Sequence, residues 1–305
     1  MLRITNAAVP LGTPSAIEDV AAKRLRVKAQ DVASVAIVRK TLDARRYHGA
    51  PIQFVYQLDV ALKDGAKAEN NVLAHLRRDK NVAQRVEKPH EPVPDRPLAD
   101  GERRPVVVGF GPAGMFAALT LARAGQCPLV LERGQDVDTR HKDIERFWSG
   151  GAFSPQSNVQ FGEGGAGTFS DGKLTTRTND PHIADILEAF IAAGAPEEIR
   201  YLHKPHIGTD LLRTIVKNIR KEIIRLGGEI RFGAQVTGIE LAGGALAAVV
   251  VNGEERIACD TAFFGIGRGP RHDLGVANHV YHTAELPQEA AAEEDANEGE
   301  LYAEE

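Results

Sequence analysis

The sequence has few cysteines, no long apolar run and no recognisable targeting segment. Its two cysteines, Cys127 and Cys259, lie 132 residues apart, which excludes a disulfide framework and a CxxC redox pair. No apolar run is long enough to span a bilayer. The first twenty residues lack an apolar segment followed by a cleavage site, and they contain acidic residues, which disfavours a transit peptide. We therefore expect a cytoplasmic protein with no membrane partner.

Composition is that of a globular protein with an acidic end. Hydrophobic residues make up 43% and charged residues 26% of the 305 residues, a length that accommodates two domains. The net charge of −5 is unevenly distributed, because residues 272–305 hold ten acidic residues and no Lys or Arg. Such a segment buries too little apolar surface to fold. We expect residues 271–305 to form a disordered acidic tail.

The remaining residues divide at a proline-rich stretch. Residues 1–88 alternate strand-like runs at 2–7, 34–38 and 52–62 with helical patterns at 16–25 and 69–78, which predicts a small α+β domain of order βαββα. Five prolines fall within residues 88–105, so residues 89–104 are interpreted as a linker. Residues 105–270 then form the domain that carries the chemistry.

A strand, a glycine turn and a helix open this domain. Three valines from Val106 to Val108 predict a buried strand, and Gly109, Gly111 and Gly114 follow with GxGxxG spacing. In this motif the first glycine allows a tight turn, the second lets backbone approach a pyrophosphate, and the third lets helix and strand pack closely. The helix is expected to end at Gly125. Its N-terminus offers unpaired amides to a phosphate.

An acidic residue at the end of the next strand limits the choice of dinucleotide. Residues 128–131 predict a second strand that ends at Glu132, eighteen residues beyond Gly114, where a carboxylate can accept hydrogen bonds from a ribose 2′-hydroxyl. Because Glu132 would repel a 2′-phosphate, NADP is disfavoured at this site. FAD and NAD both remain possible, since each has a free hydroxyl at that position.

A second glycine cluster lies between residues 150 and 176. It holds seven glycines among polar residues and could wrap an extended ligand through its backbone amides, although its composition also fits a surface loop. A helix-like run at 210–226, a strand at 231–240 and a β-meander around Asn252 and Gly253 follow. A last strand at 261–266 leads into Gly267.

The sequence resembles a known family at these motifs. The fingerprint, the ERG triplet at residues 132–134 and GEGGAGTFSDGKLTTR at residues 162–177 are similar to the uncharacterised FAD-dependent dehydrogenases, also named NAD(P)/FAD-dependent oxidoreductases, among the glutathione-reductase-like flavoproteins. The resemblance covers residues 1 to about 265. It implies an α/β fold, an FAD/NAD(P)-binding three-layer Rossmann-like domain with a β-meander.

The resemblance also implies an FAD site. The pyrophosphate would lie at the glycine turn, the adenosine at Glu132, Arg133 and the backbone of Val236, and the ribityl or flavin side at the second glycine cluster. The cofactor-binding residues expected are Gly109, Gly111, Pro112, Ala113, Gly114, Glu132, Arg133, Gly164, Gly165, Gly167, Thr168, Val236 and Gly267. Ser170, Asp171 and Lys173 could stand near the flavin, although a solvated loop is favoured for them. No catalytic residue is assigned, and HxxH at His203 and His206 is interpreted as a pair of structural or surface residues, so no metal is expected.

The resemblance stops near Gly267, where family members continue into a substrate domain, and we expect a chain truncated there. The function expected is that of an FAD-dependent oxidoreductase acting by hydride or two-electron transfer on an unknown small molecule, with NAD(P)H as a possible electron partner. One alternative is an NAD-dependent dehydrogenase without flavin. Another is a catalytically silent fragment whose first domain, with Arg39, Lys40, Arg45 and Arg46, binds RNA or a protein, although nucleic acid is not favoured.

Overall fold

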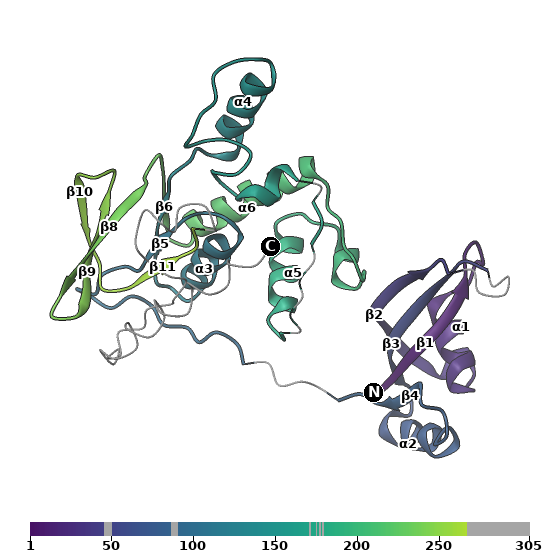
Figure 1. Ribbon diagram of the computed structural model, residues 1–305. Helices are drawn as coiled ribbons and strands as arrows, with labels where there is room; N and C mark the ends of the chain where they lie inside the picture. Colours follow the sequence, from purple (N-terminus) through teal and green to yellow (C-terminus); the bar gives the residue numbers. More distant parts are fainter. Residues whose placement is uncertain are drawn as a thin grey trace, which may run out of the picture. The chain divides into compact units, whose positions relative to one another are not determined.

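The computed structural model describes residues 1–45, 51–86, 91–170, 172–174, 176, 178 and 180–266. The chain forms two compact units. Figure 1 labels their helices and strands. The first unit comprises Met1–Pro92 and Phe169–Asn218, and the second comprises Val93–Thr168 and the chain from Ile219 onward. The domain boundaries expected from the sequence stay predictions, and the acidic tail lies outside the described residues.

The first unit contains a four-stranded antiparallel sheet with two helices. Its strands lie in the order β2-β3-β1-β4, and the chain order is βαββαβ, a split β-α-β arrangement. The elements are β1 (Leu2–Pro10), α1 (Ile17–Leu25), η1 (Ala29–Asp31), β2 (Val32–Asp43), β3 (Gln53–Leu62), α2 (Gly65–His75) and β4 (Val82–Gln84). The order βαββα expected from the sequence was therefore incomplete, because the three-residue β4 is too short to show a periodic pattern.

Both helices of this sheet pack into one hydrophobic core. Leu2 and Ile4 of β1 and Leu58 and Val60 of β3 are fully buried against apolar residues of α1 and α2. These side chains alternate along their strands with outward-facing polar residues, as the two-residue period of a strand requires. The buried face therefore fixes the register of β1 against β3.

Truncation of Leu58 to alanine should destabilise the first unit by about 2–5 kcal/mol, because a large side chain is removed from a closed core. Leu42→Ala provides a matched control, since Leu42 of β2 is 54% exposed and its loss should change stability by less than about 0.5 kcal/mol. Urea unfolding followed by circular dichroism measures both. Equal midpoints for the two variants would contradict this core.

The rest of the first unit follows residue 168. It contains α5 (Ile183–Ala192), the short 3₁₀ helix η4 (Glu197–Arg200) and most of α6 (Thr209–Arg225). Residues 201–203 add to the edge of β2, because Lys40 donates its amide to the carbonyl oxygen of Tyr201 and accepts from the amide of His203. An edge strand is thereby partly covered.

The second unit is built on a parallel sheet of order β11-β5-β6-β7, with an antiparallel three-stranded meander, β10-β9-β8, beside it (Figure 1). Helix α3 packs against β5, β6 and β11. The elements of the second unit are β5 (Val106–Val108), α3 (Pro112–Arg123), β6 (Leu129–Glu132), α4 (Val137–Trp148), η3 (Ala166–Phe169), β7 (Glu229–Phe232), β8 (Val236–Ala242), β9 (Ala245–Val251), β10 (Glu255–Ala258) and β11 (Ala262–Phe264). This is the three-layer Rossmann-like fold expected from the sequence.

Alternation along the central strands explains the layers. Val106, Val108 and Leu129 face the meander, where they share a core with Val249 and Cys259. Val107 and Val130, which are also fully buried, alternate with them and point to the opposite face, the side on which α3 packs. Strands buried on both faces explain the continuous valine and leucine runs.

Three elements of the second unit differ from expectation. The single strand predicted at 231–240 is two strands, β7 and β8, which belong to different sheets. They are separated at Gly233, whose φ of +64 turns the chain. Helix α4 was not predicted. Cys127 is only half-buried and has a left-handed φ of +47. Within the described residues, no helix is long and apolar enough to cross a membrane.

Candidate functional site

The carboxyl end of β5 and the N-terminus of α3 form a backbone cradle in the second unit. After Val108 the chain turns at Gly109, whose amide donates to the carbonyl oxygen of Leu131 at 2.8 Å. Gly111 is the N-cap of α3, with Pro112 at the first helical position, and no side chain caps this end. The first amides of a helix have no partner within it and carry a partial positive charge. This end of α3 can therefore bind an anion.

Two of the three fingerprint glycines are required by the protein itself. A Cβ at Gly109 would lie 2.8 Å from the carbonyl oxygen of Gly265, and its φ of +89 is left-handed. A Cβ at Gly114 would lie 1.9 Å from the carbonyl oxygen of Gly109. Both glycines therefore have the structural roles expected from the motif, a tight turn and close packing of helix on strand.

Gly111 is different, because the protein leaves room for a larger residue there. A Cβ at this position would have Gly165 Cα, at 3.8 Å, as its nearest neighbour, and its φ of −73 is open to any residue. Neither backbone strain nor internal packing explains the glycine. Close approach of a ligand to the backbone is the remaining role that the motif assigns to this glycine.

Glu132 connects the glycine turn to the end of β6. Its carboxylate is 4% exposed and accepts hydrogen bonds from the amides of Phe110, at 2.6 Å, and Gly134, at 2.8 Å. A carboxylate has about four acceptor positions, so two such bonds leave capacity for a ribose hydroxyl. The contact with a ribose stays a prediction.

The second glycine cluster rests on the glycine turn. The amide of Gly164 donates to the carbonyl oxygen of Phe110 at 2.8 Å. A Cβ at Gly165 would meet Pro112 Cδ at 3.1 Å and Gly111 Cα at 3.2 Å, so the two segments lie in close contact. Both Gly164 and Gly165 have left-handed φ values, of +80 and +66. The structure therefore brings together the two motifs that the sequence singles out.

The other predicted residues have varied environments. Thr168 is 1% exposed, and its hydroxyl has no hydrogen-bond partner among the described residues. Arg133 donates to Gln156 and lies 4.3 Å from the ring centre of Phe161. Ala113 follows Pro112 in the first turn of α3, Gly167 is exposed in η3, Val236 is buried at the start of β8, and Gly267 lies outside the described residues.

A fully buried arginine lies beside this cradle. Arg140 of α4 is 0% exposed, and its guanidinium donates to backbone carbonyl oxygens of five residues between 158 and 165. The acceptors are Asn158 at 2.7 Å, Val159 at 2.9 Å, Gly162 at 3.3 Å, Glu163 at 2.7 Å and Gly165 at 2.9 Å. Burial lowers the pKa of Arg140 to about 10, against the opposing fields of Glu132 and Glu163.

Glu163 is the matching buried acid. One carboxylate oxygen accepts from the amide of Val137 at 2.7 Å and lies 3.1 Å from the guanidinium of Arg220 in α6. The other oxygen has no hydrogen-bond partner among the described residues. Burial raises the pKa of Glu163 to about 7, although Val137 and Arg220 oppose the shift. The carboxyl group therefore titrates near neutral pH.

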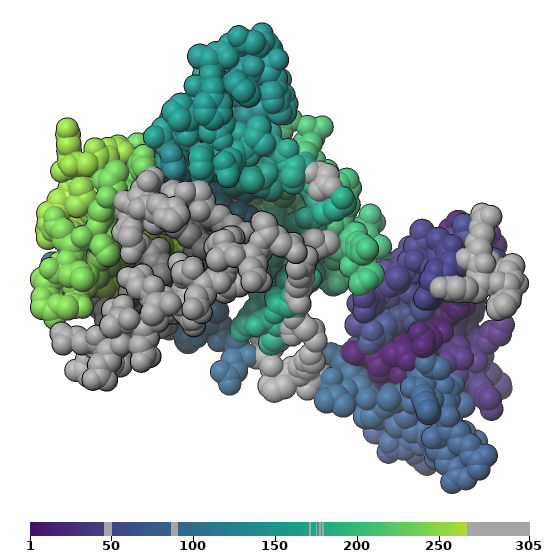
Figure 2. All heavy atoms as spheres, viewed as in Figure 1, coloured from purple at the N-terminus to yellow at the C-terminus, as the bar shows by residue number. Residues whose placement is uncertain are grey.

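Arg140, Glu163 and Arg220 were missed by the sequence reasoning. The segment 137–148 is mostly polar, and its one local signal of a helix is Asp136, which caps α4 by accepting from the amides of Asp138 and Thr139. Nothing in the pattern marks Arg140 as buried. In Figure 2 the teal atoms of α4 and the segment after it gather at one end of the second unit.

Several other candidate residues belong to the first unit. Ser170 and Lys173 are exposed, and Asp171 lies outside the described residues. His203 contacts Arg39, and burial, with Arg39 and Lys204, lowers its pKa. Within the described residues, no group of three or more His, Cys, Asp or Glu side chains is placed to hold a metal ion.

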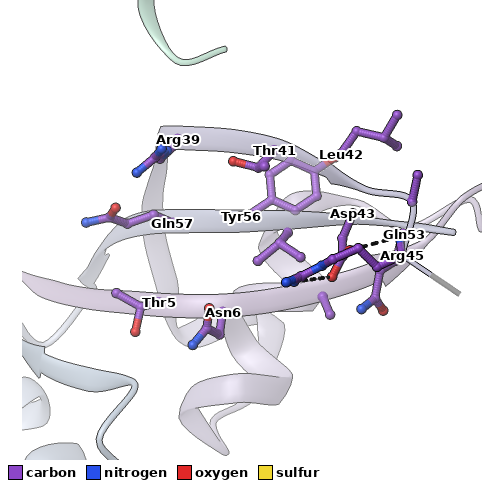
Figure 3. A pocket seen from close by; sticks show the side chains of 13 residues that line it. Thr5, Asn6, Arg39, Thr41, Leu42, Asp43, Arg45, Gln53, Tyr56 and Gln57 are labelled. Atoms are coloured by element: carbon purple, nitrogen blue, oxygen red, sulfur yellow. Dashed lines mark hydrogen bonds and ion pairs between the residues drawn. The ribbon is translucent and has the colours of Figure 1, made fainter. Parts of the chain in front are cut away.

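The first unit also has a hollow on its sheet. It has a volume of about 910 Å³ and is lined by residues of β1, β2 and β3, among them Thr5, Thr41 and Tyr56 (Figure 3). Arg45, one of the basic residues considered for RNA binding, pairs with Asp43 there. Arg39 contacts His203, and Lys40 lies 4.3 Å from the ring centre of Phe54. Arg46 lies outside the described residues. RNA or protein binding stays a prediction.

Comparisons with known proteins identify relatives of unknown activity. Residues 1–61 match a family described as a domain of unknown function, DUF8436. An uncharacterized protein of Clostridium beijerinckii is 42% identical over 271 residues, which cover 88% of this chain and 49% of that protein. The chain thus spans about half the length of this relative.

Among solved structures, three similar ones cover just over half of the chain. THI4 of Thermovibrio ammonificans is 14% identical over 58% of this chain and 64% of its own, with a TM-score of 0.37. Thioredoxin reductase of Lactococcus lactis is 20% identical over 53% of this chain and 35% of its own chain, with a TM-score of 0.29. Glycine oxidase of Bacillus cereus is 12% identical over 53% of this chain and 54% of its own chain, with a TM-score of 0.34. Likenesses at this level say nothing about the activity of this chain.

Proposed function

We propose that the second unit binds FAD and that the chain belongs to an FAD-dependent oxidoreductase. The observation that carries this proposal is Gly111, a glycine that neither the backbone conformation nor the packing of the protein requires. It stands at the uncapped N-terminus of α3, where an extended diphosphate ligand would approach the backbone.

FAD is favoured over NAD alone by the second glycine cluster. Residues 162–165 lie against the glycine turn, and Thr168 supplies a buried hydroxyl without a partner among the described residues. A buried polar group of this kind normally has a hydrogen-bond partner, and a cofactor hydroxyl or phosphate would provide one. An NAD-dependent dehydrogenase has less use for so long a second segment.

The protein's own contribution would be to bind and orient the cofactor. The amides at the start of α3 would hold the pyrophosphate, and Glu132 would accept from the adenosine ribose and repel a 2′-phosphate. A bound flavin supplies hydride or two-electron transfer. We propose that the substrate is a small molecule, that NAD(P)H is the electron partner, and that the protein acts in the cytoplasm.

Ligand-induced thermal stabilisation distinguishes the candidates. The purified chain should be stabilised by FAD more than by NAD, and NADP should give the smallest shift because Glu132 stands at the ribose position. Glu132→Gln removes the charge and should reduce the discrimination against NADP. A chain that NAD stabilises and FAD does not would be an NAD-dependent dehydrogenase, and the proposal would be wrong.

A further inference from the structure

A single side chain binds the backbone at five positions of the segment 158–165. Arg140 donates to the carbonyl oxygens of five residues in this segment, and all of its N–H groups lie in the interior of the second unit. Guanidinium has five N–H donors in a fixed planar fork, whereas an ammonium has three. Lysine at this position could not satisfy the same carbonyl groups.

Such an arrangement is costly unless the charge is compensated. A buried guanidinium loses its hydration, and the opposing charges of Glu132 and Glu163 repay part of that cost. Glu163 in turn faces Arg220 of α6, and Asp136 and Asp138 at the start of α4. One buried cation, Arg140, one partly buried cation, Arg220, and two buried acids, Glu132 and Glu163, therefore lie around one loop.

The loop of residues 158–165 ends against the backbone cradle at the N-terminus of α3. Gly165, whose carbonyl oxygen accepts from Arg140, lies against Gly111 and Pro112, and the amide of Gly164 binds the carbonyl oxygen of Phe110. Any change in residues 162–165 would therefore shift the surface that faces the start of α3. The guanidinium of Arg140 is therefore placed where it can hold the backbone of this surface in one conformation.

We propose that Arg140 is a positioning residue for the cofactor, which holds the second glycine cluster against the glycine turn in the shape that binds the diphosphate. The proposal rests on FAD binding by the second unit. Arg140 acts through the backbone of residues 158–165, with Glu132 as its main buried counter-charge.

The test compares Arg140→Lys with two controls on the same helix. Arg146→Lys changes an exposed arginine that pairs with Asp143, and Ile144→Val weakens the core beneath α4 without changing the loop. FAD affinity is measured by quenching of flavin fluorescence and is expressed per folded molecule. Arg140→Lys should lower this affinity at least tenfold, while both controls stay within about twofold of the unmodified chain.

A purely structural role would give a different result. Arg140→Lys would then lower thermal stability, as Ile144→Val does, but would leave the affinity of the folded molecules unchanged, and the proposal would be overturned. If the unmodified chain binds no FAD, the proposed function is wrong. Amide hydrogen exchange then tests separately whether Arg140 holds the backbone of residues 158–165 in place. Exchange at Glu163, Gly164 and Gly165 should be at least tenfold faster in Arg140→Lys than in Ile144→Val, and equal rates would overturn the proposal.

Discussion

Gly114→Ala should prevent the second unit from folding stably. The added Cβ would lie 1.9 Å from the carbonyl oxygen of Gly109 and 2.9 Å from its carbonyl carbon, distances that no rotamer change relieves because both partners are backbone. Gly109 cannot move away easily, since it is itself in contact with Gly265. We expect a loss of about 4 kcal/mol or more, at the extreme of single substitutions. Urea unfolding and the yield of soluble protein measure it.

Gly111→Ala is the matched control, because it adds the same methyl group three residues earlier. There the Cβ would meet nothing closer than 3.8 Å, so stability should fall by about 1 kcal/mol or less, the cost of alanine at an N-cap. FAD affinity should nevertheless fall at least tenfold, because the methyl group stands where the pyrophosphate approaches. Unchanged affinity in this variant would refute the role assigned to Gly111.

Glu163→Gln should remove a pH dependence of stability. Burial raises the pKa of Glu163 from its ordinary value of 4.5 to about 7, so between these values the folded chain binds more protons than the unfolded chain. The contribution of the group to stability is therefore fully present below pH 4.5 and is lost as the pH rises through about 7. The shift corresponds to up to about 3 kcal/mol.

Urea unfolding at pH 5 and pH 8 measures this effect. The unmodified chain should lose more stability than Glu163→Gln over this interval, because glutamine cannot ionise and still offers an acceptor to the amide of Val137. Glu254→Gln, a change at an exposed acid between β9 and β10, should leave the pH dependence as it is. Parallel pH curves for the unmodified chain and Glu163→Gln would show that Glu163 does not titrate in this range.

The strand, turn and helix from Val106 to Arg123 could be predicted because their determinants are local. A valine run, a glycine spacing and a proline at the first helical position act within one short segment. The contact of Gly165 with Gly111 joins motifs 54 positions apart, and no local pattern in either motif predicts it.

The buried charges could not be predicted, for a physical reason. Arg140 is stabilised in the interior by five carbonyl groups of another segment that converge on it, and no local pattern encodes that convergence. The separation of β7 from β8 depends on a single left-handed glycine, Gly233, within an otherwise strand-like run. Similarly, β4 pairs with β1 across more than 70 positions.

Stoichiometric retention of FAD tests the central claim most directly. The chain and Gly111→Ala would each be mixed with excess FAD, separated from free ligand by gel filtration, and examined for flavin absorbance per chain. The unmodified chain should retain one equivalent of FAD, and Gly111→Ala, folded to the same extent, should retain much less. A folded but colourless unmodified chain would contradict the account.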